Sequence, residues 1–168
     1  MRIAGLNKND FANGQWVCVS LFVQGCPHKC FNCFNPETWD FEGGEQEPLD
    51  IKGQIIKAIC ANGITRNFSV LGGEPLCPEN VEEVSHIIAG VRMAYPNIKI
   101  FTWTGYTLEE LKKQDNEYIN DILSHIDVLI DGPYIDSQRD LTIPLRGSTN
   151  QRILYKGIDF WFFKKIFL

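Results

Sequence analysis

Apolar residues along the chain fall into two alternating patterns, which predict strands and helices in turn. Short runs rich in β-branched and aromatic residues are typical of buried strands, and four of them occupy 16–23, 68–71, 98–103 and 127–130. Between these runs, apolar residues three or four positions apart predict helices over about 50–62, 79–95 and 117–125. Thr107 and Glu110 form a capping box for one further helix. Residues 2–6 and 151–155 are candidates for two more short strands.

The order of these elements predicts the fold. Strands that alternate with helices form a parallel sheet with right-handed crossovers. A closed barrel of eight such units takes about 250 residues, whereas this chain has 168. We therefore expect one α/β domain over residues 1–168, built as an open, partial parallel β/α barrel. Residues 7–15, which contain the turn signal Asn13-Gly14, and residues 34–48 are expected to be mostly loop.

Charge and composition narrow the class of protein. A formal net charge of −5 argues against a nucleic-acid-binding surface, which usually needs a basic patch. The N-terminal residues become polar at once, so we expect no signal peptide, and no run of about 18 apolar residues predicts a membrane span. We therefore expect a cytoplasmic protein, in which the six cysteines would serve as metal ligands before disulfides.

Three of the cysteines, Cys26, Cys30 and Cys33, are spaced C-x3-C-x2-C directly after the strand at 16–23. Gaps this short allow one loop to wrap around an iron–sulfur cubane. Three thiolates would leave one iron open for another ligand, as at a catalytic metal site. A structural zinc site is the alternative, with His28 or a distant cysteine as the fourth ligand. The remaining cysteines are dispersed, and we expect them to pack as small apolar residues: Cys18, Cys60 and Cys77.

Glycines and polar residues also follow the other predicted strands. In parallel α/β folds ligands bind at the carboxyl ends of the strands. Four motifs fall there: the cysteine loop, Gly72-Gly73-Glu74, Trp103 to Gly105, and Asp131-Gly132. The two glycines allow a ligand to approach the backbone closely, and the Glu74 carboxylate favours a cationic group over a phosphate. A tight turn with an acidic residue in the first helical turn is the structural alternative. The coincidence of the four motifs indicates one shared ligand site.

Together these segments resemble the radical S-adenosylmethionine superfamily and, within it, the activating proteins of anaerobic (class III) ribonucleotide reductases. The cysteine motif carries the first resemblance. Phe34-Asn35-Pro36, Gly72 to Pro75, and Gly147 to Arg152 add the second, which covers roughly residues 1–155. The resemblance implies a radical S-adenosylmethionine barrel and a [4Fe-4S] cluster on the three cysteines. It also implies that S-adenosylmethionine is bound by loop and strand-end residues: Asn32, Gly72, Gly73, Glu74, Thr102, Thr104, Gly105 and Asp131.

The same resemblance implies the reaction and the partners. A low-potential electron donor would reduce the cluster, and the cofactor would split into methionine and a 5′-deoxyadenosyl radical. This radical would take a hydrogen atom from a glycine in a C-terminal loop of the large subunit of anaerobic ribonucleotide reductase. The cofactors do this chemistry, so no side chain is expected to act as an acid or base. A chain this short suits a site open to a loop of another protein. We expect complex formation with the reductase, together with self-association.

Two other functions fit the cysteine motif. One is another small radical enzyme, which would act on a different protein or on a small heterocycle. The other is a zinc- or cluster-binding module without catalysis. The aromatic tail at 156–168 departs from the family pattern. It is too short to span a bilayer, and we expect it to cover the core, with partner docking or a weak surface anchor as alternatives.

Overall fold

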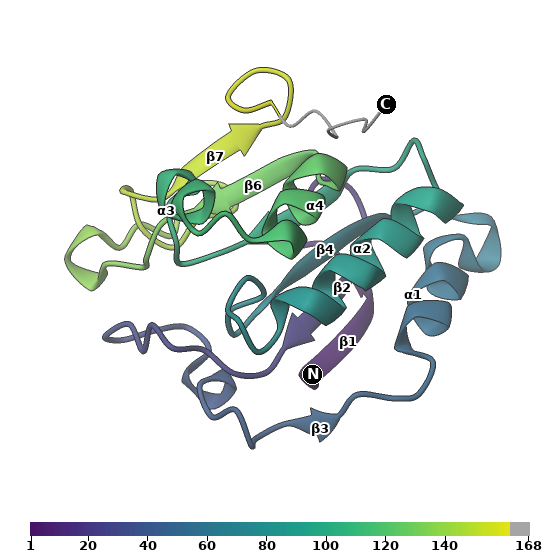
Figure 1. The fold of residues 1–168 in the computed structure, drawn as a ribbon, viewed down its shortest axis with the longest axis horizontal. Helices are drawn as coiled ribbons and strands as arrows, with labels where there is room; N and C mark the ends of the chain where they lie inside the picture. Colours follow the sequence, from purple (N-terminus) through teal and green to yellow (C-terminus); the bar gives the residue numbers. More distant parts are fainter. Residues whose placement is uncertain (162–168) are drawn as a thin grey trace.

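The computed structural model describes residues 1–161, and within them the backbone forms one open, mixed sheet. Its strands are Arg2–Asp10 (β1), Cys18–Val23 (β2), Glu45–Gln46 (β3), Asn67–Gly72 (β4), Ile100–Trp103 (β5), Val128–Asp131 (β6) and Arg152–Tyr155 (β7). They pair in the order β3-β1-β2-β4-β5-β6-β7 (Figure 1). The central strands β2, β4, β5 and β6 are parallel, whereas β1, β3 and β7 join antiparallel.

Helices cover one face of this sheet (Figure 1). Their bounds are Ile51–Ile59 (α1), Val81–Ala94 (α2), Leu108–Lys113 (α3) and Glu117–His125 (α4). Because side chains alternate between the two faces of a strand, every second strand residue meets these helices. Val19 and Leu21 of β2, for example, belong to the same buried core as Ile55 of α1 and Ile88 of α2. This layer is the main apolar core of the described chain.

Loops cover the opposite face, which carries a smaller apolar cluster built on Phe101. The loop between β1 and β2 lies against it, because the Ser69 hydroxyl donates to the carbonyl oxygen of Asn13 at 2.5 Å. Gly14 in the same loop has a φ of +143°, and a Cβ there would lie 2.5 Å from the Cys18 sulfur. The predicted turn at this position therefore requires glycine.

Local side-chain bonds set the ends of the helices. The capping box predicted from Thr107 and Glu110 is present at the start of α3. The Asp50 carboxylate accepts from the Gly53 N–H at 3.1 Å and begins α1. This helix ends at Ile59, earlier than predicted, because the chain tightens into a 3-10 turn over Ala61–Gly63.

The structure confirms the α/β class and the open sheet, and corrects two expectations. The sheet is parallel only across its four central strands. Residues 7–10 belong to β1 rather than to a loop, since this strand continues to Asp10 and pairs with β2 across a register shift. A connection as short as residues 11–17 favours an antiparallel pair, because a parallel pair needs a long crossover.

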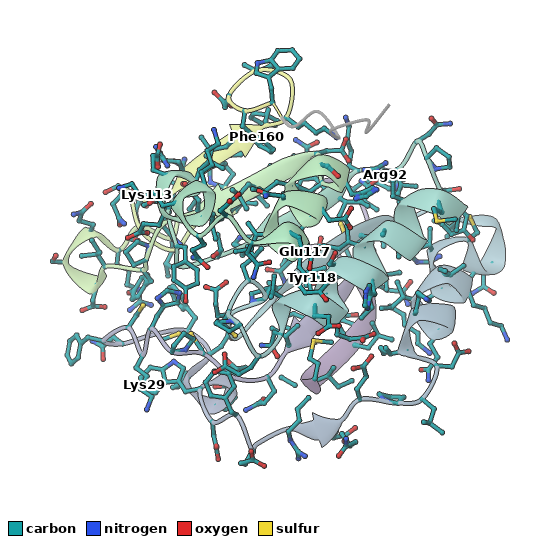
Figure 2. The ribbon with its side chains drawn as sticks, in the orientation of Figure 1. Lys29, Arg92, Lys113, Glu117, Tyr118 and Phe160 are labelled. Atoms are coloured by element: carbon teal, nitrogen blue, oxygen red, sulfur yellow. The ribbon has the colours of Figure 1, made fainter. Side chains whose placement is uncertain are left out.

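The C-terminal tail is described only in part. Phe160 follows β7 (Figure 2), is 1% exposed and packs in the main core, whereas Ile158 and Trp161 are exposed. The expectation that the tail covers the core therefore holds for Phe160, and its remainder, 162–168, lies outside the described residues. No helix within residues 1–161 is long and apolar enough to cross a membrane.

Candidate active site

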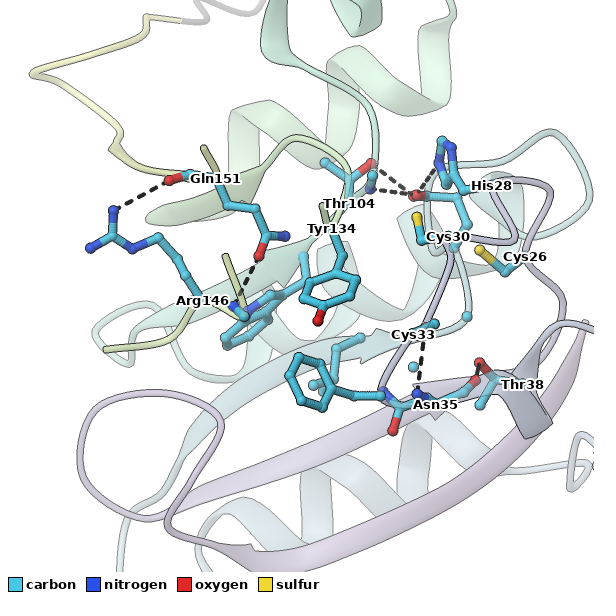
Figure 3. A pocket seen from close by; sticks show the side chains of 18 of the residues that line it. Cys26, His28, Cys30, Cys33, Asn35, Thr38, Thr104, Tyr134, Arg146 and Gln151 are labelled. Atoms are coloured by element: carbon cyan, nitrogen blue, oxygen red, sulfur yellow. Dashed lines mark hydrogen bonds and ion pairs between the residues drawn. The ribbon is translucent and has the colours of Figure 1, made fainter. Parts of the chain in front are cut away.

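The carboxyl ends of the parallel strands surround a cavity of about 430 Å³. Cys26 and Cys30 lie on one side of it, and Arg146 and Gln151 lie on the other (Figure 3). Eight of the residues selected from the sequence line this one cavity: Cys26, Cys30, Cys33, Gly72, Gly73, Glu74, Thr104 and Gly105. The strand ends thus bring the cysteine loop, the glycine-glutamate turn and the turn after β5 together.

The cysteine loop is tied closed at its base. The N–H of Gly25 donates to the carbonyl oxygen of Thr38 at 2.8 Å, and the N–H of Cys26 donates to that of Trp39 at 3.2 Å. Inside the loop, Lys29 and Asn32 have left-handed φ angles of 46° and 53°, which turn the chain sharply between the cysteines. The spacing read from the sequence therefore produces a sharply turned loop whose three cysteines line one cavity.

The three thiols differ in their surroundings, although all three are free. Burial raises the pKa of the Cys26 thiol to about 11, so without a metal this group keeps its proton at neutral pH. Burial also raises the pKa of Cys30, against a backbone hydrogen bond from Tyr134 that lowers it. The Asn35 N–H donates to the Cys33 sulfur at 3.4 Å. Hydrogen bonds to cysteine sulfurs are among the features that set the potential of a cluster.

The three thiols are not gathered around a point. Within residues 1–161, no group of three or more His, Cys, Asp or Glu side chains is arranged to hold one metal ion. A cubane cluster does not require such a group, because each thiolate binds a different iron.

Glu74 is the polar centre of the cavity wall and is only 1% exposed. Its Oε1 accepts from the Leu76 N–H at 2.9 Å and from the Thr104 hydroxyl at 2.8 Å. Its Oε2 accepts from the Gly105 N–H at 2.7 Å and from His28 Nε2 at 2.8 Å. Figure 3 draws the bonds that His28 and Thr104 make here as dashed lines. Four donors from three separate segments therefore hold a buried carboxylate beside the cysteines.

His28 occupies a well-defined position beside that carboxylate. Its ring packs edge-on against Tyr106, with 4.5 Å between the ring centroids. A Cβ at Gly105 would lie 2.5 Å from its Cδ2, so the ring fits only because residue 105 is glycine. His28, the alternative zinc ligand of the cysteine motif, is instead bonded to Glu74.

Three residues selected from the sequence do not line the cavity. Thr102 lies beside Val70 and Leu129 in the sheet, both members of the core under the helices. Asp131 is fully buried; it accepts from the Leu108 N–H at 2.7 Å, where α3 begins, and from Arg152 Nε at 2.9 Å.

The third, Asn32, is exposed, and its side-chain amide donates to Asp136 at 3.1 Å.

The cavity is also lined by Tyr134, Arg146 and Gln151, which the sequence does not mark as part of a site. The Tyr134 ring lies 5.1 Å from that of Phe34, and the Trp39 indole nitrogen is buried without a partner among the described residues. Gln151 accepts from the Gly147 N–H at 2.9 Å and holds the turn that carries Arg146. The segment from Gly147 onward supported the family resemblance, but its spacing does not say which residues face a ligand.

Comparison with known proteins assigns the class first. The family of 4Fe-4S single cluster domains matches residues 12–154, so the chain belongs to a family of proteins that hold one [4Fe-4S] cluster.

Curated relatives narrow the assignment. The anaerobic ribonucleoside-triphosphate reductase-activating protein of Haemophilus influenzae is 39% identical over 145 residues, which are 86% of this chain and 91% of the relative. The protein of that name in Enterobacteria phage T4 is 35% identical over 154 residues, 90% of this chain and 92% of its own. The Escherichia coli protein is 34% identical over 143 residues, 84% and 90% of the two chains. The chain therefore belongs to the family of anaerobic ribonucleoside-triphosphate reductase-activating proteins.

Proposed function

We propose that this chain is the activating enzyme of an anaerobic ribonucleotide reductase. In this proposal Cys26, Cys30 and Cys33 hold a [4Fe-4S] cluster with one open iron, and S-adenosylmethionine binds beside it. The product is a glycyl radical on the large subunit of the reductase. One observation carries the proposal: the three thiols and the Gly72–Glu74 turn line the same cavity at the carboxyl ends of parallel strands.

The residues around the cavity fit both groups. Of the six cysteines, only those of the loop line it, which supplies three soft ligands and leaves a fourth corner open. The volume of about 430 Å³ lies in the usual range for a small-molecule site, about 300–1,000 Å³. A Cβ on Gly73 would lie 2.3 Å from the carbonyl oxygen of Gly25. Position 73, in the turn beside the cysteine loop, must therefore be glycine.

Each part of the site has a task in this proposal. Glu74 places a negative charge where the cofactor carries its amino group. Phe34, Trp39, Trp103 and Tyr134 line the cavity and would exclude water from it. When bound, the cluster and cofactor would supply radical chemistry: one electron from a low-potential donor would cleave the S–C5′ bond, and a hydrogen atom would be taken from the reductase glycine. The chain itself binds and orients the cofactor and excludes water from the site.

The fold and the rim support the rest of the proposal. Four parallel strands in an open sheet with helices on one face agree with a partial barrel of the radical S-adenosylmethionine type. Phe31 in the cysteine loop and Leu141, which lines the cavity, are 77% and 67% exposed. Apolar side chains at an open rim suit the entry of a loop from the reductase. A low-potential electron donor would approach the cluster from outside.

Anaerobic reconstitution tests this function. The wild-type protein should bind four irons and four sulfides, and with reductant it should release 5′-deoxyadenosine from S-adenosylmethionine. Adding the reductase subunit should produce a glycyl radical doublet in electron spin resonance. Zinc in place of iron and sulfide would contradict the proposal. So would cofactor cleavage without a radical on the reductase.

Two cysteine variants test the ligands. Cys26→Ala should lose most of the iron because one corner of the cluster has no ligand. Cys60→Ala is the matched control, since Cys60 is exposed, contrary to the expectation that it packs as a small apolar residue, and does not line the cavity. It should keep wild-type iron. An intact cluster in Cys26→Ala would show that the ligands are misassigned.

A further inference from the structure

The Glu74 carboxylate has no acceptor position left for a ligand. A carboxylate offers about four lone-pair sites to donors, and four donors already occupy them at 2.7–2.9 Å. Glu74 is also 1% exposed. A cationic ligand can therefore bond to this carboxylate only if one of the present donors leaves.

Three of the four donors are fixed in place. The N–H groups of Leu76 and Gly105 belong to the backbone. The Thr104 hydroxyl lies on a residue that is 4% exposed, and it also accepts from the Tyr106 N–H at 3.1 Å. Moving any of these donor nitrogen or oxygen atoms would require the turns after β4 or β5 to rearrange.

The fourth donor, His28, is different. Its side chain is 19% exposed and lines the cavity. It is carried by the cysteine loop rather than by the turns after β4 and β5. Rotation about its side-chain bonds would free Glu74 Oε2 without moving the backbone, and would open that oxygen towards the cavity.

We propose that in the free protein the His28 imidazole occupies the position of the cofactor's amino group on Glu74 Oε2. When the cofactor binds, its ammonium group replaces the imidazole there. This inference rests on the proposed function, because it takes S-adenosylmethionine as the ligand. The exchange makes the cofactor break one hydrogen bond to a charged acceptor before it forms its own. His28 is thus a positioning residue, which keeps the buried carboxylate satisfied and lowers the affinity for the cofactor.

Binding to the reconstituted, oxidised protein tests the exchange, because without an electron the cofactor is bound but not cleaved. Isothermal titration under anaerobic conditions gives the Kd of S-adenosylmethionine for wild type, His28→Ala and His28→Gln, each with its iron content measured. Since a hydrogen bond to a charged group no longer has to be broken, His28→Ala should bind about tenfold more tightly. His28→Gln keeps an N–H donor and should bind close to wild type.

A cofactor analogue that lacks the α-amino group identifies the competing atoms. Without an ammonium to replace the imidazole, this analogue should bind wild type and His28→Ala with the same Kd. Equal or weaker binding of S-adenosylmethionine by His28→Ala would overturn the exchange. Weaker binding that His28→Gln restores would mean that His28 supports the bound state instead.

Two further results keep the inference separate from the proposed function. Should wild type fail to bind S-adenosylmethionine at all, the proposed function fails. Should wild type bind while His28→Ala gains nothing, only the exchange fails. If His28→Ala loses its cluster, His28→Asn replaces it, because its amide is too short to reach Glu74 and the same tightening is expected.

Discussion

Replacing Glu74 with glutamine would perturb the polar centre of the site while keeping its shape. Each carboxylate oxygen accepts one backbone N–H, from Leu76 on Oε1 and from Gly105 on Oε2. The amide NH₂ of Glu74→Gln must take one of these two positions, so a donor would face a backbone donor in either orientation. The other partner of each oxygen can adapt, because the Thr104 hydroxyl can rotate and the His28 ring can change tautomer.

The structure sets the size of the effect. Losing one hydrogen bond from a buried N–H to a charged acceptor costs about 1.5–3 kcal/mol. The bonds that remain are no longer charge-assisted, and each loses about half of its strength. The variant is also relieved of a buried charge, which offsets part of this loss. We expect Glu74→Gln to lower the free energy of unfolding by about 3 kcal/mol, a large share of the 5–15 kcal/mol typical of a domain.

Urea unfolding of the apo protein, followed by circular dichroism, measures this change without interference from a cluster. Glu45→Gln is the matched control, since Glu45 is exposed on the edge strand β3, and it should stay within about 0.5 kcal/mol of wild type. If Glu74→Gln were as stable as Glu45→Gln, the carboxylate would not be held by the donors described above. His28 would then have no fully occupied carboxylate from which a cofactor could displace it.

Two further substitutions test residues away from the cavity. Thr102→Val removes a buried hydroxyl that has no partner among the described residues. The free energy of unfolding should therefore rise by about 1 kcal/mol, and the cofactor Kd should not change. A weaker Kd would place Thr102 in the binding site after all. Phe160→Ala empties a fully buried position in the core and should cost about 3–5 kcal/mol in urea unfolding. A loss below about 1 kcal/mol would mean that this part of the tail does not support the core.

The sequence predicts the shared cavity because parallel strands put their carboxyl ends at one edge of the sheet. It does not predict the side of the sheet to which each strand residue points. Thr102 follows Phe101 and precedes Trp103, so the alternation of side chains turns it away from the cavity that Trp103 lines. The strand Ile100-Phe101-Thr102-Trp103 has apolar residues on both faces. Its sequence therefore does not indicate which face meets the helices.

Asp131 illustrates a different limit. An acidic residue at a strand end suggests a ligand for a cation or cofactor. The partner of this carboxylate is instead the guanidinium of Arg152, 21 residues further along the chain. Pairings of this length depend on how β7 returns along β6, which local patterns do not encode. The same holds for the bond between His28 and Glu74, which joins residues 46 apart.

The site therefore depends on strand register, and the register is held at the opposite end of the strand. Thr104 and Gly105 reach Glu74 only while β5 keeps its alignment with β4 and β6, because a slip of one residue would turn every side chain to the other face. At the start of β5 the Lys99 N–H donates to the Asn67 side chain at 2.9 Å, and the Ile100 N–H donates to Asp127 at 2.9 Å. These two polar side chains take no part in the cavity, yet they fix β5 against both of its neighbours. The cysteine spacing can be recognised in one loop. The position of the carboxylate beside it depends instead on contacts at the far end of β5, which is four residues or about 13 Å long.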